Sequence, residues 1–317
     1  MSPESVVDGA YRAILGREPD AEGRRHMLEA LNEGRLSVAE LISNMLASPE
    51  YRRAHTDDGL TFSVSRPVCT LIQDRLRLWV DLADRFVSLG CLLGDYEPSE
   101  TRFVLSNLKP GDVFLDIGAN VGWFAILAAD RVGPNGRVHA FEPRAETARL
   151  LDRSIVDNGF SERVRLHVTA LGAEDGVGRL LGSETSTNLG GFRLARDADE
   201  AFPRMTSETV SLTALDSLPI EAPVRLIKLD VEGAEPQVLE GARKLIARDR
   251  PLILSEVFAP GLRHVSNQEP ADYAALVAGL GYRMYALTNG EPGELIADAA
   301  VLDAPHPVNV ILIPAEA

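Results

Sequence analysis

Residues 112–142 read DVFLDIGANVGWFAILAADRVGPNGRVHAFE. The apolar run Val113–Leu115 opens this stretch, a turn of small residues follows at 118–122, and residues 123–129 have the apolar spacing of a helix. A Gly-Pro-Asn-Gly turn then leads into a second short apolar run, 138–141. The order strand, tight turn, helix, turn, strand predicts one right-handed βαβ unit of a parallel sheet, and therefore an α/β fold.

Two carboxylates stand at the ends of the two predicted strands, where open parallel sheets bind their ligands. Asp116 closes the first strand and Glu142 closes the second. Glu142 lies about 20 residues beyond Gly122, the spacing at which a carboxylate binds ribose hydroxyls in dinucleotide folds. We interpret Gly118 and Gly122 as positions where the backbone approaches a ligand, and we assign Asn120 of the same turn to that ligand site.

The glycine pattern of this turn distinguishes between cofactors. A dinucleotide loop has the pattern G-x-G-x-x-G, but residues 116–122 read D-x-G-x-x-x-G. A carboxylate before the turn would repel a pyrophosphate, and it suits a ligand that carries an ammonium and a sulfonium group. S-adenosylmethionine is such a ligand, with its adenosine at Glu142 and its methionine at Asp116. We therefore expect Asp116→Ala to abolish cofactor binding. The alternative is an ordinary βαβ unit, in which the acid at each strand end is coincidental.

Four segments in this order resemble the FkbM family of S-adenosylmethionine-dependent methyltransferases. They are DIGANVGWFAI, GRVHAFEP, IKLDVEGAE at 227–235 and RPLILSE at 250–256. The resemblance covers roughly residues 60–315 and implies a Rossmann-like class I methyltransferase, with a seven-stranded, mostly parallel sheet and helices on both faces. On this basis we expect a helical accessory domain at 1–56, a segment covering the cofactor site at 57–108, and the methyltransferase core at 109–317.

The resemblance also suggests cofactor contacts outside the βαβ unit. Family members commonly carry a Tyr-Glu pair where this chain has Tyr96 and Glu97, and we assign Glu97 to the cofactor. A helix cap with an apolar staple explains the same pair equally well. Thr169 and Ala170, in the turn after the third predicted strand, are expected beside the adenine. Arg144 departs from the family, in which asparagine is common at that position.

A second group of carboxylates follows the fourth and fifth predicted strands. Asp230, Glu232 and Glu235 leave the fourth strand, and Glu256 ends the fifth. Like charges this close raise one another's pKa unless a cation lies among them. Lys228, the sulfonium, a divalent metal and a substrate amine are the candidates for that cation. Glu232 and Glu235 would also be favourable simply because they precede a helix, whose amino terminus is positive.

The resemblance implies that Asp230 and Glu232 belong to the active site. We assign Asp230, Glu232 and Glu256 to the methyl acceptor, with Asp230 also contacting the cofactor. The same three carboxylates are candidates for an Mg²⁺ site, which is an additional hypothesis. His264, in a loop with proline and glycine, is a candidate catalytic base, although a loop histidine more often faces solvent.

The composition limits the classes of function. The chain has 317 residues and a formal net charge of −15, which argues against nonspecific binding to nucleic acid or to an anionic membrane. No apolar run approaches the ~18 residues of a membrane span, and the amino terminus has no basic or apolar leader. The cysteines, Cys69 and Cys91, lack metal-type spacing, so we expect two reduced thiols in a cytoplasmic protein.

Two further segments lie outside the predicted core. Residues 3–56 have the pattern of three short helices and resemble a small bacterial domain of unassigned function. We expect that domain to pack or dock, onto a protein partner or a second copy of the chain. Residues 173–209 are polar and long for a connection between core elements. We expect an irregular segment there, either a lid over the substrate or a solvated insertion.

The sequence therefore predicts a methyltransferase that uses S-adenosylmethionine. The resemblance favours O-methylation of a sugar or natural-product acceptor, glycoside or polyketide in type. One alternative is a non-catalytic scaffold that binds the cofactor and docks a partner. The other is a nicotinamide-dependent oxidoreductase, against which the missing G-x-G-x-x-G pattern argues.

Overall fold

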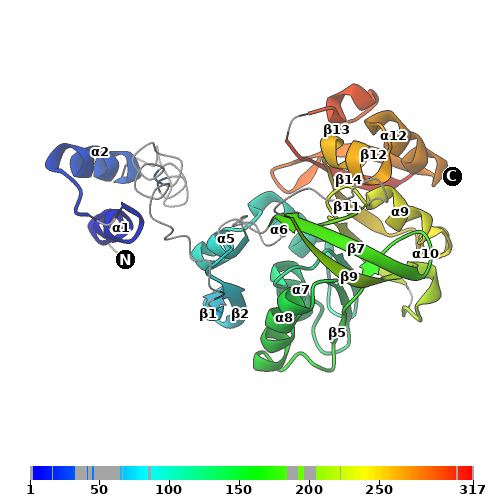
Figure 1. Ribbon diagram of the computed structural model, residues 1–317, viewed down its shortest axis with the longest axis horizontal. Helices are drawn as coiled ribbons and strands as arrows, with labels where there is room; N and C mark the ends of the chain where they lie inside the picture. The colour runs from blue at the N-terminus through cyan, green and yellow to red at the C-terminus, as the bar shows by residue number, and fades with distance from the viewer. Residues whose placement is uncertain are drawn as a thin grey trace. The chain divides into compact units, whose positions relative to one another are not determined.

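The chain forms two compact units in the computed structural model, Met1–Ser65 and Arg66–Ala317 (Figure 1). The finer boundary that the sequence suggests at residue 108 stays a prediction. The structure describes residues 3–15, 17–32, 41, 45, 65, 67–84, 87–183, 192–195, 205–221, 223–304 and 306–315.

The first unit is helical, as predicted. It contains α1 (Pro3–Ala10), a π-helical turn η1 (Tyr11–Leu15) and α2 (Ala21–Asn32). Asp20 caps α2, because its Oδ1 accepts a hydrogen bond from the Gly23 amide at 2.8 Å. A small core joins these helices to two residues of the predicted third helix, and its buried members are Val7, Ala10, Tyr11, Leu41 and Met45. The rest of that helix lies outside the described residues.

The second unit is built on a large sheet with the strand order β13-β12-β14-β11-β10-β3-β4-β5. The five strands from β11 to β5 are parallel, and β14 lies antiparallel between β11 and β12. This order confirms the predicted α/β class. The strands are β3 (Val113–Ile117), β4 (Arg137–Phe141), β5 (Val164–His167), β10 (Val224–Leu229), β11 (Leu252–Val257), β12 (Tyr282–Thr288), β13 (Glu291–Leu295) and β14 (Val308–Pro314).

Helices cover both faces of this sheet, because successive strand residues point to opposite sides (Figure 1). In β3, Phe114 packs into the core beneath one helical layer, whereas Leu115 and Ile117 pack beneath the other. The first layer has α5 (Val87–Leu93), α6 (Pro98–Asn107), α7 (Trp123–Val132) and α8 (Ala145–Asp157). The second has α9 (Glu235–Glu240), α10 (Arg243–Asp249) and α12 (Pro270–Gly279), with the short turns η2 (Leu215–Ser217), α11 (Ala259–Gly261), η3 (Leu262–Ser266) and η4 (Ala299–Leu302).

The sheet has one strand more than the seven that we predicted. The additional strand, β13, pairs only with β12 and forms the edge of the sheet. Its residues include Glu291, Pro292 and Gly293, which disfavour strands in isolation. Proline is tolerated there because the outer side of an edge strand needs no hydrogen-bond partner.

The segment before the core forms a hairpin of β1 (Pro67–Ile72) and β2 (Leu76–Asp81). The hairpin packs on α8, where the Trp79 amide donates to Ser154 Oγ at 2.9 Å. The Ser154 hydroxyl in turn donates to the Leu150 carbonyl at 2.9 Å, so it connects the hairpin to α8.

The prediction that residues 173–209 are irregular was wrong for the described part. A second sheet forms there, with the order β6-β9-β7-β8. These strands were not predicted because glycine lowers strand propensity. In the fold, Gly178 and Gly182 leave room for the side chains of Leu212 and Phe192. Residues 184–191 and 196–204 of the predicted lid lie outside the described residues. The strands are β6 (Ala170–Leu171), β7 (Gly176–Ser183), β8 (Arg193–Leu194) and β9 (Met205–Thr213).

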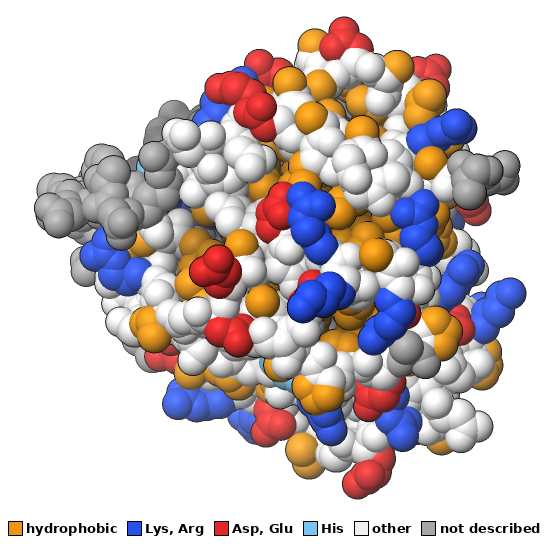
Figure 2. All heavy atoms as spheres, turned by 90° about the vertical axis from the view of Figure 1, so that its right-hand side faces the viewer, with side chains coloured by type: hydrophobic (Ala, Val, Ile, Leu, Met, Phe, Trp, Pro, Cys, Tyr) orange, Lys and Arg blue, Asp and Glu red, His pale blue; other side chains and the backbone are white. Residues whose placement is uncertain are grey.

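The negative net charge is not evenly distributed over the surface. Figure 2 shows a face on which Lys and Arg side chains surround a recess that contains hydrophobic side chains. None of the helices that the structure describes is long and apolar enough to cross a membrane.

Candidate active site

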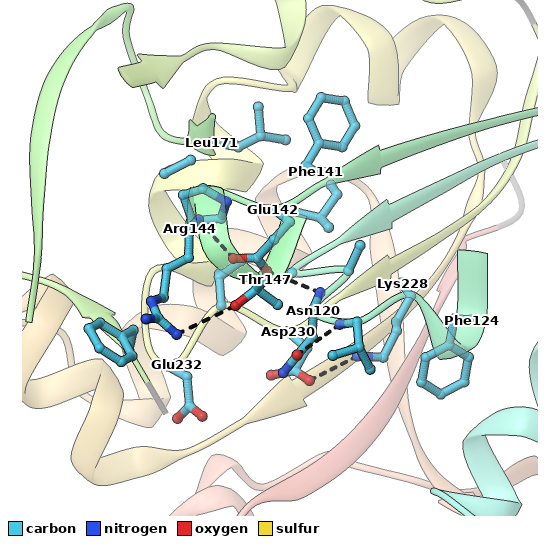
Figure 3. A pocket seen from close by; sticks show the side chains of 18 of the residues that line it. Asn120, Phe124, Phe141, Glu142, Arg144, Thr147, Leu171, Lys228, Asp230 and Glu232 are labelled. Carbon is cyan, nitrogen blue, oxygen red and sulfur yellow. Dashed lines mark hydrogen bonds and ion pairs between the residues drawn. The ribbon is translucent and has the colours of Figure 1, made fainter. Parts of the chain in front are cut away.

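A cavity of about 330 Å³ lies at the carboxyl ends of β3, β4, β10 and β11 (Figure 3). One end is bounded by aromatic and aliphatic groups, which include Phe141 and Leu171. The other end is bounded by carboxylates, Lys228 and aromatic rings, which include Tyr96 and Phe124. The assigned residues that line the cavity are Glu97, Gly118, Asn120, Glu142, Thr169, Ala170, Asp230, Glu232 and Glu256. Of the other assigned residues, Asp116, Gly122 and His264 do not line it.

Glu142 follows β4, and two backbone amides hold its carboxylate. Oε2 accepts a hydrogen bond from Asn120 N–H at 3.0 Å, and Oε1 accepts one from Arg144 N–H at 2.8 Å. Burial raises the pKa of Glu142 to about 7, while these two amides favour the ionised form. Each oxygen keeps a lone pair for a ligand, so the carboxylate is well placed to receive two neighbouring hydroxyl groups.

The turn between β3 and α7 needs its two glycines for contacts within the protein. Gly118 has φ of +82°, and an ideal Cβ there would lie 1.8 Å from the Asp230 carbonyl oxygen. Gly122 has φ of +94°, and its Cβ would meet Leu151 Cδ1 at 2.2 Å. We interpreted these glycines as places where a ligand approaches, but the close neighbour is the chain itself. Asn120, with φ of 49°, supplies the amide that holds Glu142.

Thr169 and Ala170 lie at the apolar end of the cavity. The Thr169 hydroxyl is 2.9 Å from both Ser211 O and Thr213 Oγ1, so it is already engaged with β9. What these two residues offer a ligand is therefore mainly their backbone and their methyl groups.

Asp116 lies inside β3 and is fully buried. Neither carboxyl oxygen makes a hydrogen bond of ordinary geometry, although the Ala125 amide is close enough to favour ionisation. Burial raises the pKa of Asp116 to about 7, and Lys228, its register partner on β10, opposes that rise. The side chain thus lies behind the cavity wall, next to Lys228.

Lys228 is the functional residue that the sequence reasoning treated only as a counter-ion. Its ammonium is buried, 2.8 Å from Asp230 Oδ2 and 4.8 Å from the centre of the Phe124 ring. Burial disfavours the charged form, but Asp230, Glu97 and Asp116 more than compensate and raise the pKa of Lys228. The sequence does contain a signal for the pairing of Lys228 with Asp230, because side chains two residues apart on a strand point to the same side.

The carboxylates at this end of the cavity come from three elements. Glu97 precedes α6, Asp230 and Glu232 follow β10, and Glu256 belongs to β11. Burial raises the pKa of Glu97, that of Glu232 to about 7 and that of Glu256 to about 9. Neighbouring carboxylates add to each rise and Lys228 opposes it. The structure thus brings together the acceptor residues that the sequence assigned.

Two other residues of the predicted site have different surroundings. Glu235 is buried outside the cavity, where its Oε1 accepts hydrogen bonds from the amides of Val231 and Gly233 at 3.0 and 3.2 Å. It therefore shapes the loop that carries Glu232. His264 lies in the turn η3 and does not line the cavity.

The magnesium hypothesis finds no ligand set in the described part of the chain. Asp230, Glu232 and Glu256 line the same cavity, but no three His, Cys, Asp or Glu side chains among the described residues converge as a metal site requires. Asp230 already uses one oxygen for Lys228.

A chain of polar side chains behind Glu142 was not predicted from the sequence. His139 Nε2 is 2.6 Å from Glu221 Oε2, and His139 Nδ1 is 3.1 Å from His167 Nε2. The His167 ring stacks on Phe141, which lines the cavity, with centroids 4.5 Å apart. The His167 carbonyl accepts the Glu142 amide at 3.1 Å. These histidines come from β4 and β5, so only the pairing of the strands reveals them.

Arg144 is a further part of the wall that the sequence marked only as a departure from the family. Its guanidinium lies 3.9 Å from the centre of the Phe192 ring and 3.6 Å from Glu208. Because Arg144 also presents its amide to Glu142, it links the large sheet to β7, β8 and β9 around the cavity.

Comparison with known proteins finds similarity along both units. Residues 116–284 match the family described as the methyltransferase FkbM domain, and residues 1–55 match a domain of unknown function, DUF4214. A curated relative, the 31-O-demethyl-FK506 methyltransferase FkbM of Streptomyces tacrolimicus, is 31% identical. That alignment covers 42% of this chain and 60% of the relative, so this chain spans less than two thirds of the relative's length.

Two solved structures are similar at low identity. The methyltransferase FkbM of Methylobacillus flagellatus KT is 15% identical with a TM-score of 0.42, over 96% of this chain and 58% of that chain. The precorrin-6y C5,15-methyltransferase of Geobacter metallireducens GS-15 is 16% identical with a TM-score of 0.39, over 70% of this chain and 89% of that chain.

Proposed function

The chain belongs to the FkbM methyltransferase family, and from this premise we propose that it methylates a hydroxyl group of a sugar or natural-product acceptor with S-adenosylmethionine. The match over residues 116–284 includes the βαβ unit except the start of β3, together with Asp230, Glu232 and Glu256. It confirms the resemblance seen in the sequence and removes the basis for the oxidoreductase alternative.

The geometry of Glu142 is the observation that supports the cofactor. Its carboxylate is fixed by two amides and faces a cavity that has apolar side chains at one end and carboxylates, beside Lys228 and aromatic rings, at the other. That division matches a molecule with an adenosine at one end and a cationic methionine at the other. When bound, S-adenosylmethionine supplies a methyl group activated by its positive sulfur.

The residues have the following proposed roles. Glu142 holds the ribose, Thr169 and Ala170 adjoin the adenine, and the turn with Gly118 and Asn120 contacts the cofactor through its backbone. Glu97 and Asp230 receive the methionine part. Asp116 acts from behind the wall, through Lys228. At the acceptor, Asp230, Glu232 and Glu256 surround the reacting hydroxyl.

The choice of oxygen as the methylated atom is part of the proposal. Carboxylates within reach of the acceptor can accept a hydroxyl proton, which O-methylation must remove. The name of the Streptomyces tacrolimicus relative also refers to an oxygen of its substrate. For the first unit, a docking role stays a prediction from the sequence.

Titration calorimetry tests the cofactor first. S-adenosylhomocysteine should bind with micromolar affinity, and NAD⁺ should not bind. The enzyme is then incubated with S-adenosylmethionine and a panel of methyl glycosides and hydroxylated macrolactones, and products are identified by mass spectrometry. Binding of neither cofactor would refute the proposal. Methylation of amines instead of hydroxyls would refute the choice of oxygen.

A further inference from the structure

Glu232 is set apart from most carboxylates of the cavity by its lack of bonded partners. Asp230 is paired with Lys228 at 2.8 Å, and Glu142 accepts two amides. Within the described ranges, no hydrogen bond or ion pair reaches the Glu232 carboxyl, and Figure 3 shows it separate from the dashed contacts around it. Glu256 shares this lack of partners, but it belongs to a strand and not to a loop.

The loop that presents Glu232 is held from below by buried contacts. Glu235 accepts the amides of Val231 and Gly233, and the Ser266 hydroxyl donates to the Gly233 carbonyl. Glu232 itself has φ of 55°, a left-handed conformation that is uncommon for glutamate. The backbone therefore fixes where Glu232 points, and its carboxyl is left for a ligand.

The charges around Glu232 leave its carboxyl only partly ionised near neutral pH. Burial and the adjacent Asp230 raise its pKa to about 7, and Lys228 lowers it. Lys228 is already paired with Asp230 and also faces Glu97 and Asp116. Glu256 adds a further carboxyl from β11. Arg144, which also lines the cavity, lies against Glu146 and Glu208. Hence the next positive charge to enter the cavity decides whether Glu232 is ionised.

We propose that Glu232 is the catalytic base of this enzyme, and that it ionises in response to the positive sulfur of the bound cofactor. This inference rests on the proposed function. In the reaction, the bond from sulfur to the methyl carbon breaks, the bond from the acceptor oxygen to that carbon forms, and the hydroxyl proton passes to Glu232. The sulfonium charge and the carboxylate charge disappear together, so the cavity keeps its total charge.

Glu256 has a different role in this arrangement. With a pKa of about 9, its carboxyl is protonated at neutral pH and can donate a hydrogen bond to the acceptor oxygen. A glutamine at position 256 keeps such a donor, whereas a glutamine at position 232 removes the only group assigned to take the proton. Comparing Glu232→Gln with Glu256→Gln therefore distinguishes the loss of a base from a change that keeps a hydrogen-bond donor.

The test needs no acceptor, because it measures protons released on binding. The wild type, Glu232→Gln, Glu232→Asp and Glu256→Gln are titrated with S-adenosylmethionine and S-adenosylhomocysteine at pH 7, in two buffers of different ionisation enthalpy. The wild type should release up to roughly half a proton more with the first ligand, because a group with a pKa of about 7 is half protonated before binding. Glu232→Gln should abolish this difference, while Glu232→Asp and Glu256→Gln should keep it.

Affinity gives a second readout. At pH 8, Glu232→Gln should weaken S-adenosylmethionine binding roughly tenfold and leave S-adenosylhomocysteine nearly unaffected, because an opposite charge at this range is worth about one pKa unit. If both ligands bind the wild type with equal proton release, or if the difference persists in Glu232→Gln, the inference is wrong and the proposed function stands. If neither ligand binds the wild type, the proposed function fails, and this inference fails with it.

Discussion

The backbone carbonyl oxygen of Asp230 lies where residue 118 would carry its β-carbon, 1.8 Å from an ideal Cβ on Gly118. Two loops, after β3 and after β10, therefore meet at a contact that permits no side chain. Gly118→Ala should lower the free energy of unfolding by roughly 3 kcal/mol or more, because the φ of +82° and the backbone clash both oppose the methyl group.

Gly111→Ala is the matched control for this prediction. Gly111 also has positive φ, +94°, but a Cβ there would meet nothing within 4 Å, so only the conformational cost of about 1–2 kcal/mol applies. Urea unfolding followed by tryptophan fluorescence measures both variants, since Trp79 and Trp123 both belong to the second unit. Equal losses in the two variants would show that the contact with Asp230 costs nothing.

Glu142→Gln should weaken S-adenosylhomocysteine binding roughly ten- to a hundredfold. The carboxylate accepts the amides of Asn120 and Arg144 with separate oxygens, and the NH₂ group of glutamine would face one of those amides. A charged hydrogen bond is worth roughly 1.5–3 kcal/mol, which sets the range. Calorimetry measures the change, with Glu162→Gln on the surface as the control. An unchanged affinity would remove Glu142 from the cofactor site.

Asp116→Asn distinguishes a support role from a direct contact. Because Asp116 is fully buried and does not line the cavity, the variant should keep most of its affinity for S-adenosylhomocysteine. Loss of all binding would instead support the direct contact that the sequence suggested.

The same variant has a predicted pH dependence of stability. Burial raises the pKa of Asp116 from 3.8 to about 7, so the native protein holds this proton more tightly than the unfolded chain. The wild type therefore loses stability as pH rises from about 4 through 7, and asparagine does not. Between pH 5 and pH 8, the free energy of unfolding of the wild type should fall by roughly 1–3 kcal/mol relative to that of Asp116→Asn, as measured by urea unfolding. A constant difference would contradict the raised pKa.

For His167→Asn, we expect a pH dependence of stability that is opposite in sign to that of Asp116→Asn. Burial, with His139 beside it, lowers the pKa of His167 from 6.5 to about 4, so the unfolded chain binds this proton more tightly. Stability that the neutral histidine contributes above pH 6.5 is lost as pH falls toward 4. Between pH 7.5 and pH 5, the wild type should lose roughly 1–2 kcal/mol relative to the variant. The exposed His306 provides the control substitution, and a loss that is the same for both histidines would refute the prediction.

Much of the fold follows from local sequence. The strand, helix and strand predicted within residues 112–142 match β3, α7 and β4 in place and order. These elements have strong apolar periodicity and clear turns at both ends. The strands β7 and β13 were missed because glycine and proline weaken their local signal. Both form only through pairing, with β9 and β12 respectively.

Some residues of the candidate site could likewise be predicted from local sequence, and others could not. Glu142, Asp230 and Glu256 could be identified because each follows or ends a strand that the sequence predicts. The buried position of Lys228 between Asp116 and Asp230 depends on the register of β3 and β10, which no local pattern specifies. The contact of His139 with His167 depends on the pairing of β4 with β5 in the same way.

The sheet order also determines when the site can form during folding. Gly118 and Asp230 meet because β3 and β10 are neighbours in the sheet, although more than a hundred residues separate them in the chain. Closing so long a loop is entropically costly and makes folding slow. During synthesis, β3 can pair with β10 only after β10 has been made, so the floor of the cavity forms only then. A cofactor added to a refolding chain should therefore bind only in the late phase, and it can serve as a reporter for the step at which these two strands pair.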